Sequence, residues 1–297
     1  MTLIKVNFIT TDTGLYWRCS EAVMIAPTPA HGQCLLQGLW DFVRAGQEEI
    51  LLSYYLPACS AFITHVLLCV PFFIMDLLLC VSPQIRSWRI APDSAPVPSA
   101  RCWMECLGRL ALRYLTVVLP ATVLLKCALK TPVLPERAPS CYQLWVEVLA
   151  CFLLFDALFF AWHFSMHRFP WLYRHVHREH HKNKALIALA AQDASGAELL
   201  SLLFLALIST WLVGCHPLSE ALFHLLNSWL AIEDHCGYNL PWGLHRLFPS
   251  FGLGGAPFHQ LHHTKLSGNY APLFYSLGST FSNLQRVSYS WSRAGRF

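Results

Sequence analysis

Thirteen of the fifteen histidines in this chain fall between His163 and His263, and most of them gather in three clusters. The clusters read His163-Phe-Ser-Met-His167, His177-Arg-Glu-His180-His181 and His259-Gln-Leu-His262-His263. No cysteine lies inside a cluster, and Glu179 is the only carboxylate. Neutral imidazole is a good ligand for iron, zinc and copper, whereas magnesium and calcium prefer oxygen ligands. The clusters therefore indicate a site for first-row transition metals.

The spacing inside each cluster suits a helix, on which residues three and four apart share a face. We therefore expect His163 and His167 to point the same way, and each H-x-x-H-H cluster to present three nitrogens to one side. Eight imidazoles are too many for one tetrahedral ion, and they indicate two ions with about four nitrogens each. His235, in Glu233-Asp234-His235, follows the last apolar stretch and is the ninth predicted ligand.

Other polar residues near the clusters have weaker predicted roles. Asp156 lies seven residues before His163 and shares its helical face. A carboxylate there could accept the outer N–H of a ligand imidazole and fix its tautomer, although an aspartate that faces another helix or a buried water fits the position equally well. Glu179 lies off the shared face, and we interpret it as solvated, with a contact to the outer nitrogen of a ligand imidazole as the alternative. His31, His65, His216 and His224 are interpreted as hydrogen-bonded core or interface residues, His175 as an additional histidine, and His245 as undecided.

Other uses of the clusters fit the sequence less well. A basic, pH-titrating surface would not require three such clusters, each beside an apolar stretch. A zinc hydrolase would typically carry H-E-x-x-H, and that motif is absent, as are G-x-S-x-G and the P-loop. The chain also has no evident flavin or nicotinamide fingerprint. If the chemistry is redox, electrons must therefore come from another protein.

The composition predicts that the clusters belong to a membrane protein. Hydrophobic residues make up 55% of the 297 residues and charged residues only 13%, whereas soluble domains carry about 25% charged residues. The net charge of +4 is too small to indicate nucleic acid as a partner. Apolar stretches run over about 51–81, 107–129, 142–162 and 199–232. The first forty residues lack the basic and apolar regions of a cleaved signal peptide.

The fourth apolar stretch is interrupted by Gly214-Cys-His-Pro217. If the clusters before and after it share one site, both lie on the same membrane face, so the stretch must return as a helical hairpin, as two short spans or as a re-entrant segment. Positive residues favour the cytosol, and they flank the second cluster as Arg168, Arg174, Arg178, Lys182 and Lys184.

These observations predict an all-α integral membrane protein with about four spanning helical elements and a cytosolic, histidine-rich cap. The predicted divisions are an extracellular or luminal segment at 1–50, transmembrane helices at 51–162, and a catalytic region at 163–297 that includes the hairpin at 199–232.

The clusters, in this order on four apolar stretches, resemble the sterol desaturase / fatty acid hydroxylase superfamily of membrane di-iron oxygenases. The segments between them resemble the branch that hydroxylates cholesterol at C25. They are Leu36-Gln-Gly-Leu-Trp40-Asp41, Leu154-Phe-Asp156, Trp171-Leu-Tyr173-Arg174, Gly214-Cys-His-Pro217, Glu233-Asp234-His235, Gly237-Tyr238-Asn239 and Pro241-Trp242. The resemblance covers about residues 36–274.

The resemblance implies two iron ions, O2 as oxidant, electrons from an external NAD(P)H-linked redox partner, and a multi-pass endoplasmic reticulum location. It places the metal ligands at His163, His167, His177, His180, His181, His259, His262 and His263, with His235 as the additional one. Related outcomes are sterol C4-methyl oxidation, sterol desaturation and fatty acid hydroxylation. A sterol- or metal-binding membrane protein without catalytic activity is the alternative outside enzymes. The family usually continues with a Trp-Asp and a Gly-Thr pair after residue 274, and this chain reads Tyr275-Ser-Leu-Gly-Ser-Thr-Phe instead.

Overall fold

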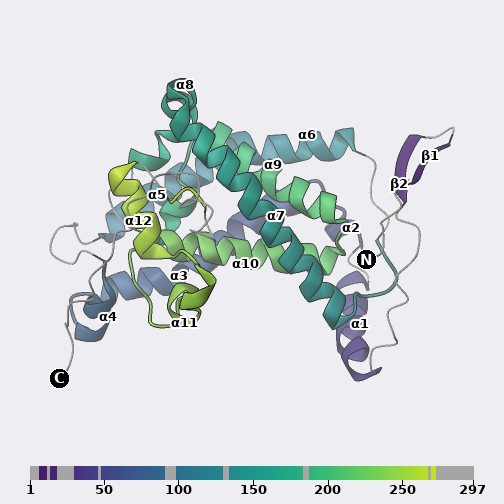
Figure 1. Cartoon of the computed structure of the whole chain (residues 1–297), viewed down its shortest axis with the longest axis horizontal. Helices are drawn as coiled ribbons and strands as arrows, with labels where there is room; N and C mark the ends of the chain where they lie inside the picture. Colours follow the sequence, from purple (N-terminus) through teal and green to yellow (C-terminus); the bar gives the residue numbers. More distant parts are fainter. Residues whose placement is uncertain are drawn as a thin grey trace.

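Long helices make up most of the structure that carries the histidine clusters (Figure 1). The computed structural model describes residues 7–11, 14–18, 30–45, 48–90, 98–129, 134–182, 187–266 and 269–271. The helices are α1 (Ala30–Arg44), α2 (Glu48–Leu51), α3 (Leu56–Leu78), α4 (Pro83–Trp88), α5 (Ala100–Arg113), α6 (Leu119–Ala128), α7 (Cys141–Arg168), α8 (Pro170–Leu172), α9 (Gly196–Val213), α10 (Pro217–His235), α11 (Leu244–Leu247) and α12 (Ala256–Lys265). The predicted all-α class is confirmed for the region that bears the clusters.

A small antiparallel sheet near the N-terminus is the departure from that class within the described residues. Strands β1 (Asn7–Thr11) and β2 (Gly14–Arg18) pair so that Asn7 faces Arg18 and Thr11 faces Gly14. The strands are rich in aromatic and β-branched residues, which favour extended backbone. The divergent segment that begins at Tyr275 lies outside the described residues, which end at Ala271.

Four helical segments are long and apolar enough to cross a membrane, namely Leu56–Leu78, Ala100–Ala128, Cys141–Arg168 and Gly196–Val213. The first three correspond to predicted apolar stretches, and the fourth corresponds to the first half of the stretch predicted at 199–232. The chain is a multi-pass membrane protein. The 28 residues of α7 measure about 42 Å at about 1.5 Å per residue, which exceeds the hydrocarbon thickness of about 30 Å. Tilting relieves such a mismatch, and α7 crosses the bundle diagonally (Figure 1).

A π-helical turn lies just before Pro120, which stands in the first turn of α6. Residues Tyr114–Val118 wind more widely than an α-helix and join α5 to α6. A proline lacks the N–H that would bond to the preceding turn, and a wider turn accommodates that loss. The segment Ala100–Ala128 is therefore continuous through the bundle.

The interruption of the fourth apolar stretch is a tight turn between α9 and α10. Gly214 ends α9 with a φ of +66°, a left-handed conformation that glycine adopts without steric cost. His216 then caps α10, because its Nδ1 accepts from the backbone N–H of Leu218 at 3.0 Å, and Pro217 occupies the first helical turn. Both helices pack on α7. The chain therefore reverses direction at this turn, and α9 and α10 form a helical hairpin.

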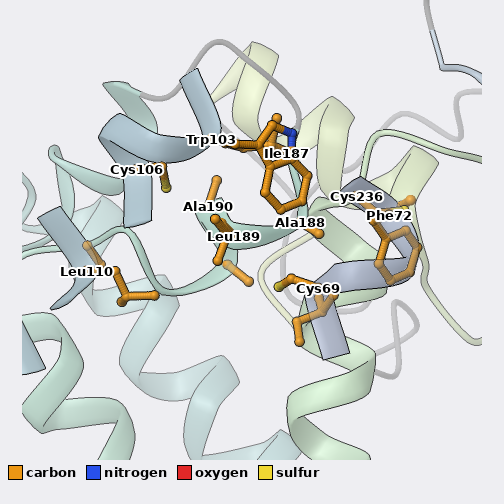
Figure 2. Close-up of a cluster of buried hydrophobic side chains, with 14 of the residues drawn as sticks. Cys69, Phe72, Trp103, Cys106, Leu110, Ile187, Ala188, Leu189, Ala190 and Cys236 are labelled. Atoms are coloured by element: carbon orange, nitrogen blue, oxygen red, sulfur yellow. The ribbon is translucent and has the colours of Figure 1, made fainter. Parts of the chain in front are cut away.

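The main apolar core lies between α3, α5 and the segment that follows the second histidine cluster. A 3₁₀ turn, Ala188–Gln192, packs against α3, α5 and α10. Figure 2 shows Cys69 and Phe72 of α3, and Trp103 and Cys106 of α5, directed at the small side chains of this turn. Close packing restricts movement in such a core. It therefore holds in place the turn that follows the second histidine cluster.

Candidate metal centre

The nine predicted ligands converge in two groups. The first group is His163, His167, His177, His181 and His262, and the second group is His180, His235, His259 and His263. In each group, every histidine offers one ring nitrogen, and these nitrogens all lie within 4.8 Å of one another. The structure thus brings together residues from α7, α10, α12 and the segment after α8.

Each H-x-x-H-H cluster is divided between the two groups, and the expectation that its three nitrogens face one side is wrong. In α12, His259 and His263 enter the second group, whereas His262 enters the first. With 3.6 residues per turn, adjacent residues point about 100° apart, so His262 and His263 diverge. In the second cluster, His177 ends a π-helical turn and His180 begins a 3₁₀ turn, and His180 enters the second group whereas His177 and His181 enter the first.

Distances between ring nitrogens match those of ligands on a common ion. In the first group, the Nε2 atoms are 3.0 Å apart for His163–His177, 2.9 Å for His177–His181 and 3.2 Å for His167–His181. In the second group, they are 3.1 Å apart for His180–His235, 2.9 Å for His235–His259 and 2.9 Å for His259–His263. Nitrogens held at about 2.1 Å from one ion lie about 3.0–3.4 Å apart. The two groups therefore fit one metal ion each.

Burial keeps these imidazoles in the form that binds metals. Loss of hydration is the main cause that lowers the pKa of His177 to about 2 and that of His235 to about 4. The pKa values of His180, His259 and His263 are also far below the usual range, first through burial and then through repulsion between neighbouring imidazolium charges. A neutral ring leaves a nitrogen lone pair available for coordination.

Three of the outer ring nitrogens are held by acceptors. His163 donates from Nδ1 to the backbone carbonyl of Tyr270 at 2.9 Å. His177 donates from Nδ1 to the Glu198 carboxylate at 2.9 Å, and His235 donates to a carbonyl of its own helix at 2.7 Å. Such bonds fix the tautomer and direct Nε2 at the metal.

Glu198 is a candidate site residue that the sequence reasoning missed, because its carboxylate contacts His177. It is buried in the first turn of α9, where Ser195 Oγ accepts from its backbone N–H at 3.1 Å. The signal was a serine followed three residues later by glutamate, just before an apolar span, which is typical of a helix start. Asp156 is buried on α7, and its contact with a ligand imidazole stays a prediction.

Glu179 is only partly solvated, because it forms an ion pair with Arg113 of α5 at 2.6 Å. Arg113 also contacts the buried Asp193 at 3.2 Å, and Arg109 contacts the same carboxylate at 2.5 Å. The two arginines attach the second histidine cluster and the turn after it to α5.

The remaining histidines whose side chains the structure describes lie outside both groups, and they are His65, His175, His216, His224 and His245. His175 is exposed and stacks on Trp171 with ring centroids 4.9 Å apart. His245 Nε2 lies 3.0 Å from the side-chain oxygen of Asn239. Neither ring takes part in the two groups.

A small pocket adjoins the second group. Asp234, Phe258, Asn269 and Ala271 line it together with His259 and two glycines. Burial raises the pKa of Asp234 well above its usual value, and the nearby carboxylates of Glu233 and Asp156 raise it further. The second group has four imidazoles, whereas the first has five. The pocket therefore lies beside the group that has fewer histidines, and His259 belongs to both.

Known proteins resemble the chain along most of its length. It is 40% identical over 270 residues to cholesterol 25-hydroxylase of Homo sapiens, which covers 91% of this chain and 97% of that protein. It is 43% identical over 256 residues to cholesterol 25-hydroxylase of Rattus norvegicus, covering 86% of this chain and 85% of the other. A cholesterol 25-hydroxylase-like protein of Danio rerio is 39% identical over 250 residues, covering 84% and 98%. The fatty acid hydroxylase family matches residues 148–282. No solved structure matches the chain.

Proposed function

The chain belongs to the cholesterol 25-hydroxylase family, and from that premise we propose that it hydroxylates cholesterol at C25 with O2 and two iron ions. It is an oxidoreductase of the hydroxylase type. The observation that carries the proposal is the convergence of nine histidines in two groups, because a set of neutral imidazoles without thiolates suits iron, zinc or copper.

One ion would be held by His163, His167, His177, His181 and His262, and the other by His180, His235, His259 and His263. Iron at these positions would supply the activation of O2. The residues of the chain hold the imidazoles in one tautomer through Tyr270 and Glu198.

The reaction inserts one oxygen atom of O2 into the C25–H bond and releases the other as water. It consumes two electrons and two protons. We infer that an external NAD(P)H-linked redox partner supplies the electrons. Position selectivity would come from holding the sterol side chain at the reacting atoms, since orientation of the reactants strongly affects rate.

We also propose an endoplasmic reticulum membrane location with the metal centre facing the cytosol. Support comes from four exposed cations beside the first and second clusters, Arg168, Arg174, Arg178 and Lys182, because positive residues near spans favour the cytosol. On this topology residues 1–50 are luminal, 51–162 contribute spanning helices, and 163–297 form the catalytic region.

Sterol profiling by mass spectrometry tests the proposed function. Cells expressing the chain should accumulate 25-hydroxycholesterol labelled from 18O2, whereas cells expressing the double variant His262→Ala, His263→Ala should not. His175→Ala is the matched control, since His175 is exposed and outside both groups. Products of C4-methyl oxidation, desaturation or acyl hydroxylation would redirect the proposal to those reactions. Bound metal without any oxidised lipid would favour a binding protein.

A further inference from the structure

Helix α1 has one face attached to the protein and another left uncovered, at the end of the bundle opposite the metal centre. In Figure 1, α1 lies beside the start of α7, whereas α8 and α12 lie toward the other end of α7. Of the four candidate spans, α7 contacts α1.

The inner face of α1 is bound to loops that connect spans. Trp40 is 2% exposed and donates from Nε1 to the carbonyl of Pro135 at 2.8 Å. The Gln37 side chain donates to the carbonyl of Glu136 at 3.1 Å and accepts from the backbone N–H of Ala138 at 2.8 Å. These three loop residues precede α7, so α1 lies at the level where a spanning helix begins.

Trp40 also connects α1 to the turn of the α9–α10 hairpin. Its ring meets His216 edge to face, with centroids 4.8 Å apart. The ring nitrogen Nε2 of His216 donates to the carbonyl of Arg137 at 3.1 Å, and its backbone N–H donates to Glu147 of α7 at 2.9 Å. A single side chain thus joins α1 to two separate span ends.

The outer face of α1 is apolar and exposed. Leu39 is 51% exposed and Phe42 is 78% exposed, and residues three apart share a helical face. The polar residues Gln37 and Arg44 lie on the other side, where they contact Glu136. A helix that offers apolar side chains on one face and polar contacts on the other is typical of the membrane–water interface.

Exposed aromatic side chains mark the same level on the neighbouring spans. Tyr55 precedes α3 and is 59% exposed, Tyr142 and Trp145 begin α7 and are 61% and 58% exposed, and Trp211 near the end of α9 is 66% exposed. Tyrosine and tryptophan concentrate at the boundary between lipid and water. They therefore place the boundary at the ends of these three helices, where α1 also lies.

We propose that the face of α1 formed by Leu39 and Phe42 lies in lipid at the membrane surface opposite the metal centre. The occupant is the acyl and glycerol region of the adjacent leaflet, because the exposed tyrosine and tryptophan side chains at the neighbouring span ends place the boundary between lipid and water at this level. By this contact α1 anchors the loop before α7 and the hairpin turn to the membrane surface. The proposal depends on the membrane spans and not on the chemistry of the metal centre.

Site-specific photocrosslinking tests the assignment in the full chain, reconstituted in phosphatidylcholine nanodiscs. The probe p-benzoylphenylalanine is introduced in place of Phe42, Leu39 or, as the control, Asp41, which is exposed and bonded to Gln37. After illumination, lipid adducts measured by mass spectrometry should be several-fold more abundant at positions 42 and 39 than at 41. Equal adducts at all three positions would overturn the proposal. Adducts to a second copy of the chain would overturn it in favour of a dimer interface.

A second measurement uses the unmodified chain and so avoids any effect of the probe on folding. A lipid-soluble diazirine is added to the nanodiscs and activated by light, and labelled residues are identified by peptide sequencing. Labelling of Leu39 and Phe42 above that of Gln37 and Asp41 is expected. Labelling of the lipid-facing side of α7 with none on α1 would contradict the proposal.

Discussion

The carboxylate of Glu198 lies 2.9 Å from Nδ1 of His177, although the two residues are 21 positions apart in the chain. Both side chains are 2% exposed. This contact joins the first turn of a spanning helix to a candidate metal ligand, and it gives the imidazole a fixed tautomer with Nε2 directed at the other histidines of the first group.

Replacing Glu198 should weaken metal binding in the first group. Glu198→Ala leaves the buried N–H of His177 without its acceptor, and loss of such an outer partner typically costs about 10–100-fold in metal affinity. Glu198→Gln keeps an oxygen acceptor, and we expect a smaller loss. Metal content measured during chelator titration checks both. Glu105→Gln, at an exposed ion pair, is the control, and equal retention in Glu198→Ala and Glu105→Gln would contradict the role assigned to Glu198.

Adjacent histidines should affect different ions. His262→Ala removes a ligand of the first group and His263→Ala removes one of the second, so each variant should release one ion more readily and retain the other. Metal stoichiometry over a chelator series, together with spectroscopy of the iron-loaded protein, distinguishes the two. Identical release curves and spectra for the variants would show that the groups are not separate sites. The exposed His175→Ala should match the unaltered chain.

Acid should destabilise the metal-free protein. The pKa values of His177 and His235 in the fold, about 2 and about 4, lie below the unfolded value of 6.5. The unfolded chain therefore binds protons first as the pH falls, so this contribution to stability is complete above pH 6.5 and decreases progressively below it. The thermal unfolding midpoint in detergent should drop between pH 7 and pH 5. A midpoint that stays constant or rises across this range would contradict the assignment of buried, neutral imidazoles.

Two glycine substitutions should have opposite effects on stability. Gly214→Ala places a side chain at a φ of +66°, which costs about 1–2 kcal/mol in the free energy of unfolding. Gly108→Ala, inside α5 with no atom within 4 Å of the new carbon, should stabilise by up to about 1 kcal/mol. Denaturation in mixed detergent micelles measures both. If both variants were equally stable, the turn at Gly214 would not have the left-handed conformation described.

Much of the fold follows from local patterns. Three of the four apolar stretches, and the first half of the fourth, are confirmed as helices long enough to span a membrane, since hydrophobicity and length act on each segment by itself. Helix ends were less predictable. The fold begins the second span at Ala100, earlier than the apolar run indicates, because Ser99 caps it and the polar side chains of its first turns find partners or solvent. The β1–β2 sheet was also missed, as short strands leave a weak pattern.

The sequence by itself determined which residues can bind metal, because cluster spacing is a property of single segments. All nine predicted histidines meet in the two groups, although metal binding by them stays a prediction. Only the tertiary structure decided how they are divided, since the direction of each imidazole depends on how α7, α10 and α12 are rotated against one another. The same holds for Glu198 beside His177 and for Trp40 beside His216. Helical periodicity relates residues within one element, whereas contacts between elements arise from packing of the whole chain.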